Sequence, residues 1–167
     1  MKRIVVIGVS GSGKTTLAIE LARRLKLSCI HADEIRWGAN WQRLAQAAFE
    51  ERIAAATATE TWVFDGNRLY LRRLVWRRAD TIIWLDYSLP VILRRACIRN
   101  FRRVLTRETL WNGNRENWRR AVGGVLQSIR AFFLSRRRIP SAIAEFSHLR
   151  VVHLRSPREA LDWLCQP

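Results

Sequence analysis

The sequence predicts a single α/β domain built on a five-stranded parallel sheet with helices on both faces. Five short apolar runs are rich in β-branched residues and show no alternation with polar residues, which is typical of strands buried on both faces. Segments with apolar residues at helical spacing separate these runs, and this order indicates a parallel sheet. The 167 residues are enough for one hydrophobic core, so we expect one domain over 1–167.

The first half of the chain accounts for three of the strands. RIVVI (3–7) is a continuous β-branched run, SCIH (28–31) is a short strand, and TWVFD (61–65) is the third. The segment 14–27 carries leucines every four residues, and the Ala-rich segment 41–58 is amphipathic. Both segments are therefore expected to be helices.

Asp65-Gly66, after the third strand, allows two interpretations. Asp-Gly between apolar runs is a strong signal for a tight β-hairpin. A parallel sheet instead requires a crossover, and RLYLRRLVWR (68–77) supplies a short helix for one. The alternation along the chain favours the crossover. It places Asp65 at the carboxyl end of a strand, where open α/β sheets bind ligands.

The second half continues the pattern with two strands and three helices. The strands are TIIWLD (81–86) and RVVHL (150–154). Arg-rich helices are expected over 88–104 and about 117–138, with the turn-rich WNGN (111–114) between them. The last helix begins at SPRE (156–159), where the serine caps the helix, the proline takes the first helical position and the glutamate reaches back.

One motif in the chain is specific by itself. GVSGSGKT (8–15) fits the P-loop pattern G-x-x-x-x-G-K-[ST], and it lies between a predicted buried strand and a predicted helix, as the motif requires. The glycines permit a tight loop whose amides converge on phosphate oxygens at a helix N-terminus. Lys14 is expected to reach the β- and γ-phosphates, and Thr15 to offer its hydroxyl to Mg²⁺. The predicted nucleotide-binding residues of this segment are Gly8, Ser10, Gly11, Ser12, Gly13, Lys14, Thr15 and Thr16.

The motif predicts binding of a nucleoside triphosphate but not the fate of its γ-phosphate. The Asn/Thr-Lys-x-Asp motif with which GTPases read their base is absent from the sequence. Large ATPase modules need a longer chain. The size therefore favours a small kinase.

The charge of the chain is strongly positive and localised. The net charge is +16, and Arg accounts for 27 of the 30 basic residues. The segment 68–138 contains 18 Arg against four acidic residues. Such a field favours polyanions such as nucleotides, nucleic acid or acidic membranes, and Arg suits forked contacts with phosphate. The alternative is an Arg-biased composition with solvated helix faces.

Other composition signals are weak. Cys29, Cys97 and Cys165 are widely spaced and form no metal-binding pattern, so they are expected to be reduced thiols. No uncharged apolar run is long enough for a membrane span, and the apolar run at the N-terminus is too short for a signal peptide. We expect a cytoplasmic protein.

Several segments in order along the chain resemble the adenylate kinase-like family of small P-loop kinases. The resemblance is closer to a bacterial group of P-loop proteins labelled adenylate kinase-related ATPases or DNA topology modulation proteins. It spans essentially the whole chain. The segments that carry it are GVSGSGKTT, HADEIRW, FDGN, TIIWLD, TRETLWNGNRE and LRSPREA.

The resemblance implies roles for residues on the ATP side. Asp65 would help to hold Mg²⁺ together with Thr15, and Asp86 is the alternative metal-binding carboxylate, although organisation of its loop fits Asp86 better. Arg95 and Arg99, four residues apart on a predicted helix, would contact ATP and stabilise the transferring phosphate. A solvated stripe is the alternative for these two arginines. The chain near Ser156 and Pro157 would pass beneath the adenine.

The acceptor side is implied less specifically. Asp33, after the second strand, would bind an acceptor hydroxyl or act as general base. Trp37 would stack on the acceptor, with simple packing as the alternative, and Arg68 would grip an acceptor phosphate. A flexible, Arg-rich helical lid is expected at about 105–121, with Arg115 and Arg119 facing the substrates. The four cysteines of a zinc-bearing lid are absent from the sequence.

The leading hypothesis is a kinase that uses ATP and Mg²⁺ to phosphorylate a small acceptor such as a nucleotide, a nucleoside or a similar metabolite. The alternative is a nucleic-acid-associated ATPase that uses the basic segment 68–138. A third hypothesis is an ATP-binding regulator without catalysis. The acceptor, the preference for ATP over GTP and the oligomeric state stay open at this point.

Overall fold

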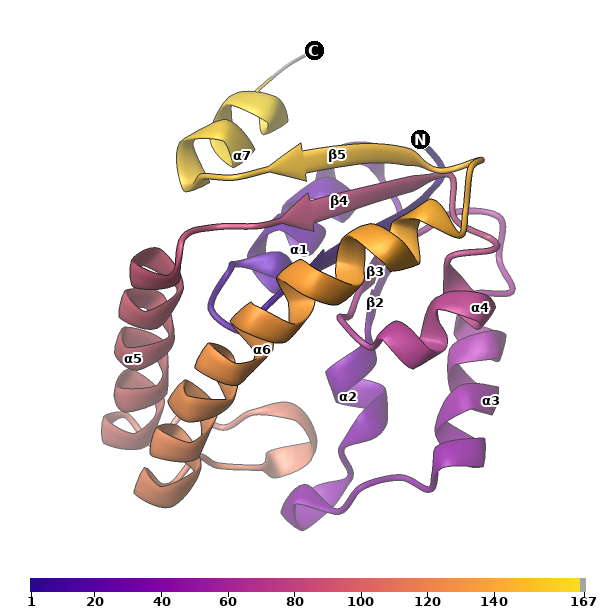
Figure 1. The fold of residues 1–167 in the computed structure, drawn as a ribbon. Helices are drawn as coiled ribbons and strands as arrows, with labels where there is room; N and C mark the ends of the chain where they lie inside the picture. The colour runs from indigo at the N-terminus through magenta and orange to yellow at the C-terminus, as the bar shows by residue number, and fades with distance from the viewer. Residues whose placement is uncertain (166–167) are drawn as a thin grey trace.

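The computed structural model describes residues 1–165 as a three-layer α/β structure (Figure 1). Its five strands form one parallel sheet in the order β2-β3-β1-β4-β5, with β1 in the centre. The predicted fold class is therefore confirmed. The strands are β1 (Arg3–Gly8), β2 (Cys29–His31), β3 (Trp62–Asp65), β4 (Thr81–Leu85) and β5 (Arg150–Leu154).

The helices and short 3-10 turns connect the strands by crossovers. The helices are α1 (Lys14–Leu25), α2 (Ala32–Arg36), α3 (Gln46–Ala56), α4 (Arg72–Val75), α5 (Leu89–Leu105), α6 (Trp118–Ala144) and α7 (Pro157–Leu164). The 3-10 turns are η1 (Ala39–Trp41), η2 (Leu69–Leu71) and η3 (Trp111–Gly113). β3 pairs in parallel with both of its neighbours and is followed by η2 and α4, so the hairpin interpretation of Asp65-Gly66 is wrong.

Two hydrophobic clusters cover the two faces of the sheet. On one face, alternate residues of the strands pack against α3, α4 and the C-terminal half of α6, with Trp62, Phe49 and Ile139 fully buried. On the other face, Ile4, Val6 and Ile83 pack against residues of α1, α5 and α7. Strands covered on both sides explain the uninterrupted apolar runs of the sequence.

The structure differs from the predicted elements in three places. The helix expected at 41–58 begins only at Gln46, because Asn40 and Trp41 have positive φ angles and close a tight loop. The short helix α2 was not predicted. α6 continues to Ala144 through Pro140, because the buried side chains of Ile139 and Ala142 anchor its last turns to the core.

The segment between α5 and α6 lies next to the loop that follows α2 (Figure 1). Its only helical part is the 3-10 turn η3, so the lid expected at about 105–121 is helical mainly at its two ends, in α5 and α6. Among the described residues, no helix is both long and apolar enough to cross a membrane.

Candidate active site

The phosphate-binding loop joins the end of β1 to the start of α1, at the carboxyl edge of the sheet. Gly11 and Gly13 have φ angles of 91° and 90°, which side-chain-bearing residues rarely adopt. A Cβ on Gly11 would lie 2.7 Å from the carbonyl oxygen of Ile92, and one on Gly8 would lie 2.7 Å from the hydroxyl of Ser12. The motif glycines are therefore required by the path of the loop and by its close packing against α5.

Lys14 begins α1, and its ammonium folds back over the loop to donate to the carbonyl oxygen of Val9 at 3.0 Å. Burial lowers the pKa of Lys14, and the charge of Arg99 adds to this effect. The negative charges of Asp65 and Asp33 oppose it. A partly buried cation beside a glycine-lined loop fits the charge and size of a phosphate group.

Thr15 and Asp65 lie on neighbouring elements and contact each other directly. Asp65 ends β3, beside β1 in the sheet, and its Oδ2 accepts a hydrogen bond of 2.6 Å from the Thr15 hydroxyl. Two oxygen donors at the phosphate loop fit Mg²⁺, which usually takes one or two protein ligands and completes its shell with phosphates and water. No group of three or more His, Cys, Asp or Glu side chains among the described residues forms a larger metal site.

His31 is a site residue that the sequence interpretation missed. It ends β2 opposite Asp65, and its Nδ1 lies 3.3 Å from the same Oδ2. The hydrogen bonds with Asp65 and Cys29 raise the pKa of His31 to about 10. Burial raises the pKa of Asp65, but the bond from His31, the charge of Lys14 and the bond from Thr15 together hold it below its usual range. The sequence signal is that SCIH and TWVFD end at the same edge of the sheet, but the register that pairs His31 with Asp65 comes from the structure.

Arg95 and Arg99 both lie beside the phosphate loop, as their four-residue spacing on α5 allows. Arg99 donates to the hydroxyl of Ser10 at 2.9 Å. Burial lowers the pKa of Arg99, and so does the charge of Arg103 nearby. Arg95 lies over the ring of Tyr87 at 5.5 Å, and its guanidinium borders the space where a Cβ of Gly13 would stand. These contacts argue against a purely solvated stripe.

The predicted acceptor residues lie on α2 and after β3. Asp33 accepts a hydrogen bond of 3.0 Å from Arg68, so the two predicted acceptor-binding side chains are paired with each other. The side chain of Asp33 is 55% exposed and that of Arg68 is 30% exposed. Trp37 forms an edge-to-face contact of 5.5 Å with Trp41 and is covered by Arg43. These contacts give Trp37 a packing role in its loop.

Two loops, one after α2 and one between α5 and α6, share one backbone design, and we call them the paired loops: 37–43 and 109–115. Each is closed by an antiparallel bridge, Trp37 to Arg43 and Thr109 to Arg115. Each contains a 3-10 turn with a central asparagine at φ 55° or 56°. The sequence interpretation predicted neither the shared geometry nor the contact between the loops.

Side-chain amides join the paired loops. Asn114, which is 3% exposed, accepts from the backbone N–H of Trp41 at 2.7 Å and donates to the carbonyl of Gly38 at 2.8 Å. The indole of Trp41 donates to the carbonyl of Arg115 at 3.0 Å, and Asn112 donates to the carbonyl of Trp37. The predicted lid and the predicted acceptor segment are therefore in direct contact.

The remaining predicted residues lie around this centre. The Arg115 and Arg119 side chains are exposed and form no hydrogen bond or ion pair within residues 1–165, and Thr16 is exposed on α1. Ser156 caps α7 by accepting from the N–H of Glu159 at 3.2 Å, with Pro157 at the first helical position, as predicted.

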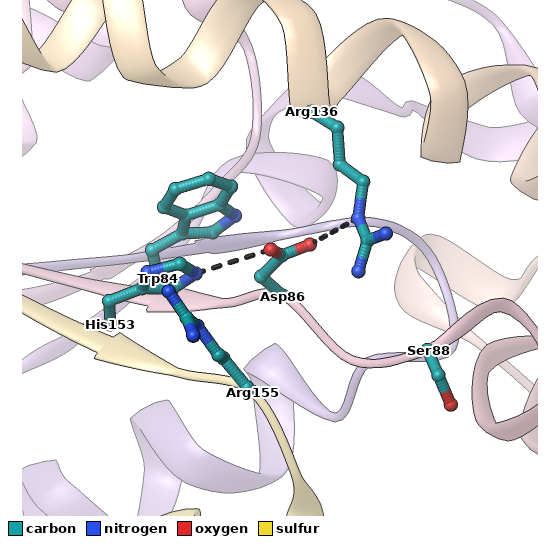
Figure 2. Close-up of a pocket in the computed structure, with 6 residues that line it drawn as sticks. All are labelled: Trp84, Asp86, Ser88, Arg136, His153 and Arg155. Carbon is teal, nitrogen blue, oxygen red and sulfur yellow. Dashed lines mark hydrogen bonds and ion pairs between the residues drawn. The ribbon is translucent and has the colours of Figure 1, made fainter.

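Asp86 follows β4, on the other side of β1 from Asp65, and both of its carboxylate oxygens are occupied. Figure 2 shows Asp86 between Arg136, at 2.9 Å, and His153, at 3.2 Å, on the wall of a cavity of about 440 Å³. The ring of His153 stacks on Trp84 at 4.1 Å. This network ties α6 to β5 and favours the organising role of Asp86 over metal binding.

Comparison with known proteins identifies likeness in structure alone. Neither the family models nor the curated proteins contain a match. Among solved structures, shikimate kinase from Acinetobacter baumannii in complex with shikimate matches with a TM-score of 0.61 and 17% identity, covering 98% of this chain and 89% of that one. The chain has the fold of small P-loop kinases.

Two further small kinases agree with this assignment of the fold. A gluconokinase from Sinorhizobium meliloti 1021 matches with a TM-score of 0.55 and 18% identity, covering 98% of this chain and 91% of that one. Shikimate kinase from Bacteroides thetaiotaomicron matches with a TM-score of 0.56 and 16% identity, covering 98% and 94%. The likeness extends over nearly all of this chain.

Proposed function

We propose that the protein is a kinase that transfers the γ-phosphoryl group of ATP to a small acceptor molecule. The observation that carries the proposal is the meeting of three features at one sheet edge. These are the phosphate loop with Lys14, the Thr15–Asp65 oxygen pair, and Arg99 bonded to the loop. Phosphoryl transfer requires positioning and charge stabilisation more than covalent chemistry, and these residues supply both.

Each of these residues has a part in the proposed mechanism. Lys14 and the loop amides would hold the β- and γ-phosphates, and Thr15 and Asp65 would hold Mg²⁺. When bound, Mg²⁺ neutralises charge on the phosphate oxygens. Arg95 and Arg99 stabilise the charge that develops on the transferring group. Near the end of β5, Ser156 and Pro157 would border the adenine.

The Asp33–Arg68 pair gives the acceptor a polar site. Because the pair is partly exposed, its net stabilisation is small, on the order of 0–1 kcal/mol, and an acceptor can separate it at little cost. Asp33 then accepts a proton or a hydrogen bond from the acceptor hydroxyl, while Arg68 binds an anionic group of the same molecule. This chemistry favours a phosphorylated or carboxylated acceptor, such as a nucleotide or a similar metabolite.

The contact between the paired loops closes the predicted lid over the acceptor segment. It brings the segment between α5 and α6 against the acceptor segment, with Arg120 over the ring of Trp41 at 4.9 Å. A closed lid excludes water and so favours transfer to the acceptor over hydrolysis. We also propose that the kinase is of the adenylate kinase-like class. The segments that support this class are GVSGSGKTT, HADEIRW, FDGN, TIIWLD, TRETLWNGNRE and LRSPREA.

The basic segment 68–138 supports a second candidate, a nucleic-acid-associated ATPase. Seven of its arginines already have hydrogen-bond or ion-pair partners inside the protein, and these are Arg68, Arg72, Arg78, Arg99, Arg102, Arg103 and Arg136. The others leave a positive surface that a polyanion would contact in a salt-dependent manner.

A single assay separates the candidates. The purified protein is incubated with γ-labelled ATP, Mg²⁺ and a panel of nucleosides, nucleoside monophosphates, sugar acids and small phosphometabolites, with Lys14→Ala as the control for contaminating kinases. The kinase proposal predicts labelled acceptor that is lost in Lys14→Ala. Free phosphate released only when DNA or RNA is added supports the second candidate, and ATP binding without turnover supports a regulator.

A further inference from the structure

One face of α6 carries large apolar side chains that are each half exposed or more. Trp118, Val122, Leu126 and Phe133 are 53%, 50%, 62% and 58% exposed. Their spacing of four, four and seven residues places them on one stripe of the helix. Single exposed apolar residues are common on protein surfaces, but an aligned series of four marks an interaction surface.

The neighbouring helix α5 extends this apolar surface. Ile98 and Leu105 are 58% and 71% exposed and lie seven residues apart, on the side of α5 away from the buried Ile92 and Ala96. α5 and α6 pack against each other beside the sheet (Figure 1), and the ring of Phe101 lies 5.7 Å from that of Trp118. We call these six exposed side chains the apolar face; they are Ile98, Leu105, Trp118, Val122, Leu126 and Phe133.

The charge on the two helices that carry the apolar face has one sign, and the nearest acidic residues, Glu108 and Glu116, lie in the segment between them. α5 and α6 contain no Asp or Glu and together carry eleven Arg. Exposed arginines on these helices include Arg94, Arg102, Arg119, Arg130 and Arg137. An occupant of this surface must therefore offer negative charge next to an apolar layer.

We propose that the apolar face binds the surface of an anionic lipid bilayer, with α6 lying along the interface. Helices with Trp, Phe and Leu on one side and basic residues beside them are typical of helices that lie in the headgroup region. The apolar side chains would enter the acyl boundary, while the arginines contact lipid phosphates. Residues 118–133 of α6 give the contact its length, and the helix beyond them packs on the core.

The other occupants fit less well. A second copy of this chain would bring arginines against arginines with no acidic residue on either helix. Nucleic acid would accept the arginines, but single strands use aromatic stacking platforms, and four of the six side chains of the apolar face are aliphatic. A bilayer suits both the aliphatic side chains and the charge.

The proposal is independent of the kinase activity. The side of α5 that touches the phosphate loop carries Ile92, Ala96 and Arg99, whereas Ile98 lies on the exposed side. Substitutions on the apolar face are therefore expected to leave ATP-dependent turnover unchanged and to alter membrane binding alone.

Co-sedimentation of the full chain with vesicles tests the proposal. One set of vesicles contains phosphatidylcholine alone and the other contains phosphatidylglycerol as well. We expect binding to the anionic vesicles and little binding to the neutral ones. The double variant Leu126→Ser, Phe133→Ser is expected to bind about tenfold more weakly or worse, since each side chain loses apolar burial. Arg130→Gln is expected to lower binding about fivefold, the equivalent of about 1 kcal/mol.

The matched control is Leu161→Ser on α7, an apolar side chain that is 63% exposed and lies outside the apolar face. It is expected to bind like the wild type. Thermal unfolding of every variant verifies that the exposed substitutions leave the fold intact. Failure to bind anionic vesicles, or unchanged binding of the double variant, would overturn the proposal. So would binding to a DNA or RNA oligonucleotide, sensitive to the same double variant, in the absence of vesicle binding.

Discussion

Asn114 joins the two sides of the candidate site through its side-chain amide. Its Oδ1 accepts from the backbone N–H of Trp41 at 2.7 Å, and its Nδ2 donates to the carbonyls of Gly38 and Trp111, each at 2.8 Å. A buried amide that makes three of its four possible hydrogen bonds is a specific connection. Asn114 is therefore a central contact between the α5–α6 segment and the acceptor segment, and the bonds from Trp41 and Asn112 add to it.

Asn114→Ala is expected to open the paired loops without unfolding the core. The change leaves the N–H of Trp41 without its partner, at a cost of about 1–3 kcal/mol that is confined to these loops. Hydrogen exchange is expected to accelerate within 37–43 and 109–115 and to stay unchanged in β1 and β3. In the kinase assay, the ratio of hydrolysis to transfer is expected to rise.

Gln42→Ala is the matched control, because Gln42 occupies the corresponding position in the first of the paired loops. Its side chain is exposed and makes no hydrogen bond within the described residues. It is expected to behave like the wild type. Equal exchange rates in wild type and Asn114→Ala would show that the amide does not hold the loops together.

Asp65→Asn and Thr15→Val are expected to impair the use of Mg²⁺. Each removes one oxygen of the 2.6 Å pair beside the phosphate loop. The rate of transfer is expected to fall about 10–100-fold at fixed Mg²⁺, the range typical for loss of a metal-site partner. Titration of the rate against Mg²⁺ concentration is the measurement, and the half-saturating concentration should increase.

Asp86→Asn serves as the control for this change, since Asp86 ends the strand on the other side of β1. Its oxygens bind Arg136 and His153, so the variant is expected to lose stability while its Mg²⁺ requirement stays unchanged. A higher Mg²⁺ requirement in Asp86→Asn, with no change in Asp65→Asn, would contradict the placement of the metal at the end of β3.

The His31–Asp65 pair predicts a pH dependence of stability. The folded protein raises the pKa of His31 from 6.5 to about 10, so the pair stabilises fully below about pH 6.5 and loses this effect as the pH rises through about 10. The pKa of Asp65 is lowered, so the contribution of its ionised form is present above its unfolded value and is lost as the pH falls through the folded value.

His31→Gln is therefore expected to cost the most stability at a pH above the pKa of Asp65 in the unfolded chain and below about 6.5, where the pair is fully charged. A hydrogen bond between charged groups contributes about 1.5–3 kcal/mol. Urea unfolding at about pH 6, 8 and 10 measures the difference between wild type and variant, which should narrow as the pH rises. His148→Gln, at an exposed position, controls for loss of a histidine. A difference that widens toward pH 10 would refute the assigned protonation of His31.

Arg68→Gln is expected to raise the KM for the acceptor and to leave the KM for ATP unchanged. Arg68 contacts Asp33 on the acceptor side and has no hydrogen bond with the phosphate loop. Steady-state kinetics with each substrate varied in turn measures the separation. Arg72→Gln, whose parent side chain pairs with Glu145 instead, is the control. Equal changes in both KM values would remove Arg68 from the acceptor site.

The fold was predictable because its signals are local. Each β-branched run lies within one strand, and the P-loop motif identifies a strand, a loop and a helix together. A parallel sheet places Asp65 at the same edge as the loop, and the strand order seen in the structure puts it on the strand next to β1. The capping role of Ser156 follows from four adjacent residues.

The paired loops could not be predicted in this way. Their contacts join side-chain amides to backbone carbonyls more than 70 residues away, as between Asn114 and Gly38, and no periodicity in the sequence reports such bonds. The left-handed conformation of Trp41, which ends the expected helix 41–58 early, depends on the same contacts. The pairing of His31 with Asp65 depends on the register between β2 and β3, and the length of a strand does not determine its register.

The destination of the γ-phosphate tests the central claim most directly. The protein is mixed with γ-labelled ATP, Mg²⁺ and a small-molecule fraction of a bacterial extract, and label in each organic product is compared with label in free phosphate. The account predicts one dominant labelled organic product in wild type and none in Lys14→Ala. Label found only in free phosphate, at equal rates with and without the extract, would contradict a kinase.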